Sequence, residues 1–121
     1  RTFADDGDPL DVVVVCAEPI HPMTLVRCYP IGVIKMLDNG RADEKIIAIP
    51  YGDPTYKSYY DVHELPAHVF EEMMHFFEVY KTLEHKRTTV QEICHRDEAV
   101  DIINKCVENY KKEFVNREEK L

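Results

Sequence analysis

The pattern of apolar and polar positions between residues 12 and 50 is typical of β-strands. Residues 12–15 are a run of valines, and β-branched residues of this kind pack well in a sheet that is buried on both faces. Residues 25–36 alternate imperfectly, and residues 46–49 form another short apolar run. The pair Asn39-Gly40 between these last two segments favours a tight hairpin, because both residues tolerate positive φ angles. The sequence therefore predicts several short strands in this half of the chain.

In the second half, the apolar positions change to helical spacing after a connector that is rich in tyrosine, glycine and proline. Pro66 suits the first turn of a helix, and the predicted buried stripe of that helix is Phe70, Met73, Met74, Phe77, Tyr80 and Leu83. Asp97 is the predicted N-cap of a second helix, whose expected apolar face is Val100, Ile103, Val107, Tyr110 and Phe114. The charged end, residues 116–121, is expected to fray. These patterns predict an α+β domain, with a small β-barrel first and two helices after it.

Composition limits the classes of protein that this chain can represent. Its 121 residues suffice for one domain, and 23 acidic against 15 basic residues give a net charge of −8, which disfavours binding to nucleic acid or to anionic membranes. The longest apolar run has six residues, far fewer than the roughly 20 that a membrane helix needs. The four cysteines form no Cys-x-x-Cys pair, so a zinc ribbon is not expected. We expect free thiols, with Cys16 and Cys106 buried.

The densest chemical signal is the acidic loop Asp5-Asp6-Gly7-Asp8-Pro9-Leu10-Asp11, directly before the first predicted strand. Two carboxylates about 4 Å apart cost roughly 4 kcal/mol at an effective dielectric constant near 20, whereas a site for a hard divalent cation concentrates them. In an extended chain Asp6 and Asp8 project to the same side, so both could face one cation. An acidic surface loop is the simpler alternative. An EF-hand loop is excluded. If Asp6 is its first position, the sixth position, which requires glycine, is Asp11.

A second polar cluster, Asp38, Asp43 and Lys45, lies across the predicted hairpin. Carboxylates hold Mg²⁺ while a lysine donates to a phosphate oxygen, so the two clusters together suit a substrate that combines phosphate and metal. An ordinary polar hairpin is the alternative. Tyr80 and Lys81 offer two further donors for an anion, although Tyr80 also fits the apolar stripe and Lys81 suits the last turn of a helix.

The histidines carry less information. His63 and His68 are five positions apart with Pro66 between them, so they do not form the zinc-peptidase motif, which needs histidines four positions apart on one helix. Histidines 21, 75, 85 and 95 are expected to lie at the surface or to be satisfied by neighbours. The sequence has no P-loop and no glycine-rich dinucleotide motif.

Taken in order, these residues resemble the signature of the soluble (family I) inorganic pyrophosphatases, with the plant and protist branch most similar. The resemblance rests on Asp6-Gly7-Asp8-Pro9-Leu10-Asp11, Pro30-Ile31-Gly32-Val33-Ile34-Lys35-Met36, Asp38 with Asp43-Glu44-Lys45-Ile46-Ile47-Ala48, Asp53-Pro54, Asp61-Val62, and Phe76-Phe77-Glu78-Val79-Tyr80-Lys81. It covers nearly the whole chain. The chain departs from the family at Met23, where glycine is frequent, and at Tyr29, where a basic residue is common.

The resemblance implies the hydrolysis of pyrophosphate to two phosphates by Mg²⁺-activated water, on an OB-like five-stranded β-barrel with two C-terminal flanking helices. Several Mg²⁺ ions per site are implied, with inhibition by Ca²⁺. The implied site consists of the metal ligands Asp6, Asp11, Asp38 and Asp43, the general base Asp8, and the phosphate-binding residues Lys45, Tyr80 and Lys81. A non-catalytic divalent-cation-binding module of the same fold is the alternative, and a structural subunit is a third possibility.

The family also places substrate and metal groups upstream of the signature, and this chain begins just before it, at Arg1. We therefore expect residues 1–121 to be a single pyrophosphatase domain truncated at its N-terminal side, which hydrolyses pyrophosphate poorly alone. The expected partners are pyrophosphate and further copies of the chain in a homo-oligomer, with no nucleic acid and no membrane. The expected location is cytoplasmic, with an organelle or an acidic storage vacuole as the alternative.

Overall fold

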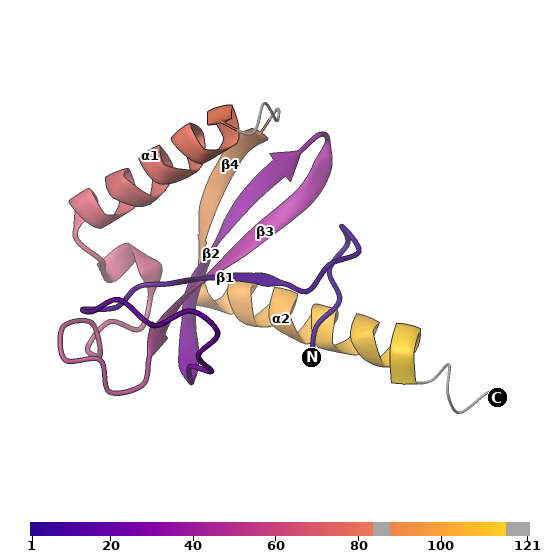
Figure 1. The fold of residues 1–121 in the computed structure, drawn as a ribbon, viewed down its shortest axis with the longest axis horizontal. Coiled ribbons are helices and arrows are strands. Elements are labelled where there is room, and N and C mark those ends of the chain that lie inside the picture. Colours follow the sequence, from indigo (N-terminus) through magenta and orange to yellow (C-terminus); the bar gives the residue numbers. More distant parts are fainter. Residues whose placement is uncertain (84–87, 116–121) are drawn as a thin grey trace.

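The computed structural model describes residues 1–83 and 88–115, except for the side chains of residues 81, 82 and 88–91. These residues form a four-stranded sheet with helices on both sides (Figure 1). The strand order is β1-β3-β2-β4, in which β1 runs parallel to β3 and the other neighbours are antiparallel. The elements are β1 (Asp11–Val14), β2 (Cys28–Asp38), β3 (Arg41–Pro50), the 3₁₀ turn η1 (Val62–Glu64), α1 (Ala67–Leu83), β4 (Thr88–His95), α2 (Arg96–Tyr110) and the π-helical turn η2 (Lys111–Val115).

The β2–β3 hairpin forms where the sequence predicts it. Asn39 and Gly40 have φ angles of 52° and 80°, and the flanking pair Asp38 and Arg41 closes the ladder. Two successive positive φ angles match the twist of the flanking strands, which fixes their register. The α+β class and the three predicted strand segments are thereby confirmed, with their ends shifted by a few residues.

Alternation along β2 and β3 gives the sheet two buried faces. One face packs Ile34 and Ile47 against Met73 of α1, and the other packs Val33 and Ile46 against Ala99 of α2. Successive side chains of a strand point to opposite sides, so one helix is needed on each face. Figure 1 accordingly shows α1 to the upper left of the β2–β3 hairpin and α2 to its lower right.

Strand β4 was not predicted. It pairs with β2 from Gly32 opposite His95 to Asp38 opposite Thr88, between the two helices in sequence. Its sequence TTVQEICH is largely polar and lacks a clear alternation, so its strand state follows from pairing with β2 rather than from local pattern. The expectation that all strands precede the two helices is therefore wrong, because β4 lies between α1 and α2 in the sequence. The five-stranded barrel stays a prediction.

Both helices differ from the prediction in detail. The buried face of α1 is Val69, Met73 and Phe77, whereas Tyr80 and Leu83, at the end of the predicted stripe, are exposed. Helical spacing places Tyr80 on the same face as these buried residues, so its exposure means that the described residues do not cover the last turn of α1. The described residues contain no helix long and apolar enough to cross a membrane.

Helix α2 begins two residues earlier than expected. His95 is the N-cap, and no side-chain hydrogen bond caps the helix there, so the prediction of Asp97 as N-cap is wrong. Asp97 instead lies in the first turn, where a carboxylate interacts favourably with the helix dipole. On the inner side of α2, Cys106 is buried, whereas Cys16 is only half-buried; all four cysteines are free thiols. The predicted frayed end, residues 116–121, lies outside the described residues.

Candidate functional site

The acidic loop is folded into a compact turn. Gly7 has a φ angle of 86°, which glycine adopts without strain, and its N–H donates to the carbonyl of Ala4 at 3.0 Å. The N–H of Ala4 donates to the carbonyl of Asp8 at 2.8 Å, and the N–H of Asp8 donates to Oδ1 of Asp6 at 3.0 Å. A further hydrogen bond, from the N–H of Phe3 to a carbonyl of α2, anchors the loop. The two aspartates on either side of Gly7 are therefore held by backbone geometry.

The loop and the hairpin meet at one open pocket of about 440 Å³. Asp38 ends β2, and Asp43 lies in β3 opposite Met36. The residues lining the pocket are Asp6, Asp8, Asp38, Asn39, Arg41, Ala42 and Asp43. Four of the five carboxylates that the sequence singles out thus line a single cavity, although they come from two separate segments of the chain.

Lys45 connects the fifth carboxylate to this group. In the parallel register Asp11 lies opposite Lys45, and the ammonium Nζ is 2.6 Å from Oδ2 of Asp11 and 2.9 Å from Oδ1 of Asp43. Burial by itself lowers the pKa of Lys45, but the hydrogen bonds to the two carboxylates outweigh burial and raise that pKa above its usual value. Lys45 is therefore a firmly charged ammonium between two carboxylates.

This arrangement fits a hard divalent cation. Carboxylate oxygens are the ligands that Mg²⁺ prefers in proteins, and here they face one polar cavity from the loop, from the end of β2 and from β3. Asp43 is buried, at 7% exposure, so its charge needs a cation nearby. Lys45 supplies one positive charge, and the open side of the pocket leaves room for more.

The structure does not gather all the predicted residues at this pocket. Tyr80 of α1 is half-exposed and lines a different pocket on α1, where its ring stacks on Phe76 with centroids 5.9 Å apart. Lys81 also lies in α1, but its side chain is outside the described residues. The roles expected of these two residues stay predictions, as do those of the carboxylates.

Two features were missed from the sequence. Asp53 is buried and accepts hydrogen bonds from the backbone N–H groups of Ala17, Thr55 and Tyr56 at 2.9 to 3.1 Å, which holds the connector in place. Separately, Asp61, His63 and His95 bring potential ligand atoms within 4.8 Å of one another. His95 lies more than 30 residues from the other two, and only β4, which was not predicted, brings it to them.

Comparison with known proteins identifies the family. A model of the family "Inorganic pyrophosphatase" matches residues 1–111. The chain is 42% identical over 117 residues to soluble inorganic pyrophosphatase 2 of Chlamydomonas reinhardtii, covering 97% of this chain and 61% of the relative. It is 44% identical over 115 residues to an inorganic pyrophosphatase of Aquifex pyrophilus, covering 93% of this chain and 65% of the relative. The chain thus spans somewhat less than two thirds of the length of these relatives.

Solved structures with a similar fold are also inorganic pyrophosphatases. The fold superposes on an inorganic pyrophosphatase of Helicobacter pylori with a TM-score of 0.86 at 33% identity, covering 91% of this chain and 66% of that one. An inorganic pyrophosphatase of Thermus thermophilus gives a TM-score of 0.85 at 33% identity, with coverage of 91% and 65%. The resemblance that the ordered motifs carry is thereby confirmed, and the chain belongs to the inorganic pyrophosphatase family.

Proposed function

We propose that the protein hydrolyses inorganic pyrophosphate to two phosphates with Mg²⁺. The observation that carries this proposal is the meeting of Asp6, Asp8, Asp38 and Asp43 at one pocket, with Lys45 beside it. Pyrophosphate is a strongly charged anion, so a site that hydrolyses it must hold cations against its oxygens and direct a water to its phosphorus. A carboxylate cluster with an adjacent ammonium offers both functions.

In this proposal Asp6, Asp11, Asp38 and Asp43 hold the metal ions. When bound, Mg²⁺ lowers the pKa of water and offsets phosphate charge. Asp8 accepts the proton of the attacking water; it is exposed and lines the pocket, and the turn at Gly7 holds it beside Asp6. Lys45 donates to a phosphate oxygen, for which its ammonium leaves one of its two carboxylate partners.

Tyr80 and Lys81 complete the proposal as donors to the phosphates. Tyr80 is 45% exposed on α1. It lines a pocket on α1 rather than the pocket of the carboxylates. This part of the proposal rests on the resemblance, and replacing Tyr80 by phenylalanine tests it through the KM for pyrophosphate.

The experiment that tests the proposed activity is colorimetric phosphate release from pyrophosphate, with Mg²⁺, with Ca²⁺ and with a chelator. Turnover with Mg²⁺ and inhibition by Ca²⁺ are expected, because the chemistry needs the compact, ordered coordination that the larger Ca²⁺ does not enforce. Binding of Mg²⁺ without phosphate release would favour the non-catalytic module instead. Nothing in the described residues favours that alternative, and the relatives compared above are named as pyrophosphatases.

We further propose a homo-oligomer located in the cytoplasm, with an organelle as the alternative location. The exposed apolar residues of α1, which include Phe76 at 59% and Leu83 at 75% exposure, support an interface with a second copy. The relatives in Chlamydomonas reinhardtii and Arabidopsis thaliana are named soluble pyrophosphatases. We also propose that the sheet closes into a five-stranded barrel, which the resemblance to the family supports. Light scattering after gel filtration tests the oligomer.

A further inference from the structure

Two histidines and an aspartate form a compact cluster away from the acidic pocket. Nδ1 of His63 lies 3.2 Å from Oδ1 of Asp61, and Nδ1 of His95 lies 3.0 Å from the same oxygen. The two imidazole rings stack, with centroids 3.9 Å apart. The histidine side chains are 48% and 66% exposed and the aspartate 29%, so an ion in solution can reach all three.

The backbone holds these groups in place. Asp61 is the N-cap of η1, where Oδ1 accepts the N–H of His63 at 3.0 Å, and Oδ2 accepts the N–H of Arg96 at 3.2 Å. His95 ends β4 opposite Gly32 of β2. Gly32 permits the close approach of η1, because a Cβ at this position would lie 2.6 Å from the Cβ of Val62. The cluster is therefore built by the sheet and the cap together.

We propose that Asp61, His63 and His95 form a binding site for a borderline transition-metal ion such as Zn²⁺. With metal–ligand bonds of about 2.0–2.1 Å, the ligand atoms of a tetrahedral zinc site lie about 3.3 Å apart, and the separations of 3.0 and 3.2 Å from the carboxylate oxygen are close to that value. Neutral imidazole nitrogen suits Zn²⁺ rather than Mg²⁺. Hydrogen bonds from backbone N–H groups to the carboxylate orient it, as is usual for metal ligands.

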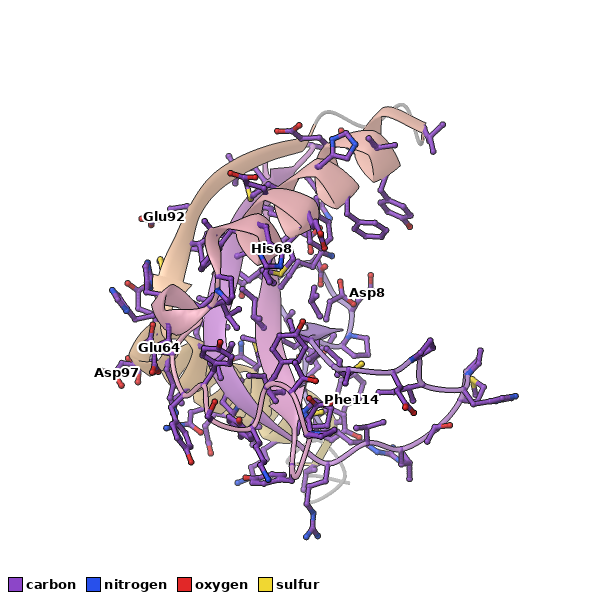
Figure 2. All side chains as sticks on the ribbon, turned by 90° about the vertical axis from the view of Figure 1, so that its left-hand side faces the viewer. Asp8, Glu64, His68, Glu92, Asp97 and Phe114 are labelled. Carbon is purple, nitrogen blue, oxygen red and sulfur yellow. The ribbon has the colours of Figure 1, made fainter. Side chains whose placement is uncertain are left out.

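This site is distinct from the acidic pocket and from the proposed hydrolysis. Figure 2 shows Glu64 of η1 and Asp97 of α2 together at one side of the molecule and Asp8 at the other. A bound ion would tie the connector before α1 to the junction of β4 and α2. Its expected effect is to stabilise that junction, with no direct contact to pyrophosphate.

The test is a Zn²⁺ titration of the metal-stripped protein against a chromophoric chelator, with excess Mg²⁺ present to fill the acidic pocket. Even residues that only support a metal ligand are worth about 10–100-fold in affinity, so His63→Gln and His95→Gln should each weaken Zn²⁺ binding by at least about tenfold. His68→Gln, which removes an exposed histidine of α1, is the matched control and should bind as the parent does. With Co²⁺ in place of Zn²⁺, the parent should show tetrahedral absorption bands that both variants lose.

Unchanged Zn²⁺ affinity in both variants would overturn the proposal, as would an equal loss in His68→Gln or displacement of Zn²⁺ by Mg²⁺. If a variant does not fold, as judged by circular dichroism, ¹⁵N spectra of the histidine side chains in the parent show which histidines bind Zn²⁺. Zn²⁺ should then shift the Nδ1 resonances of His63 and His95. Shifts confined to other histidines would equally refute the site.

Discussion

Replacing Lys45 by methionine tests how the pocket is held together without metal. Methionine keeps the length of the side chain and its apolar packing but removes the ammonium that lies 2.6 Å from Asp11 and 2.9 Å from Asp43. Lys45 is only 13% exposed and Asp43 9% at the side chain, so water cannot fully replace this contact. The substitution removes one partner of a buried ion pair and keeps the other, which is the costly way to break such a pair.

The magnitude follows from the exposure of each partner. A hydrogen bond to a charged group contributes about 1.5–3 kcal/mol, and the buried pair with Asp43 should approach this value. Asp11 is 58% exposed, so its pair with Lys45 contributes roughly 0–1 kcal/mol. Lys45→Met should therefore lower the free energy of unfolding by about 1.5–4 kcal/mol in metal-free buffer.

Magnesium should reverse much of this loss. Without Lys45, the carboxylates of Asp11 and Asp43 no longer share their charge with this ammonium, so Mg²⁺ should bind Lys45→Met more tightly than the parent and stabilise it more. Phosphate release should nevertheless fall, because the proposed donor to phosphate is gone. Urea unfolding with chelator and with Mg²⁺ measures the first effect, and Lys45→Arg, which keeps the charge, is the control. An equal loss of stability in both buffers would refute the idea that the lysine and the metal share these carboxylates.

Three further predictions concern the scaffold. Hydrogen bonds from backbone N–H groups, that of Ala17 first, lower the pKa of Asp53, so its contribution to stability is complete above the unfolded pKa of 3.8 and is lost as the pH falls through the lowered folded pKa. Asp53→Asn should lower the free energy of unfolding by about 1–3 kcal/mol near pH 7 and by almost nothing in strong acid. Urea unfolding at these two pH values measures the difference. Gly32→Ala should cost about 1–3 kcal/mol, because the new Cβ would overlap Val62; an unchanged melting temperature would contradict the close packing. Burial raises the pKa of the Cys94 thiol to about 11, so roughly one molecule in a thousand is a thiolate near pH 8, and iodoacetamide should label the half-buried cysteines first in mass spectra.

Local signals were sufficient for part of the fold. The hairpin follows from Asn39 and Gly40 themselves, since both adopt the positive φ angles that the turn requires. Helix α1 begins directly after Pro66, as the fixed φ angle of proline suggests. The sequence predicts that Asp6 and Asp43 share one site because their two polar clusters together suit a substrate that combines metal and phosphate. The structure places both residues at one pocket.

Features that depend on contacts between distant segments were not predictable in this way. Strand β4 is polar in sequence and gains its strand state by pairing with β2. Because β4 carries His95 to Asp61, the histidine cluster was invisible for the same reason. The exposure of Tyr80 likewise depends on which surface covers α1, which a helical periodicity does not state.

In the proposed hydrolysis Asp8 takes the proton of the attacking water, in a pocket whose other carboxylates hold Mg²⁺. Steady-state phosphate release at saturating Mg²⁺ tests it most directly, with Asp8→Asn compared against Asp5→Asn, which removes one charge from the same loop. We expect Asp8→Asn to lower kcat roughly 10²–10⁴-fold with little change in the Mg²⁺ requirement, while Asp5→Asn keeps kcat near that of the parent. If Asp8→Asn instead raised the Mg²⁺ requirement and kept kcat at saturation, Asp8 would be a metal ligand rather than the base.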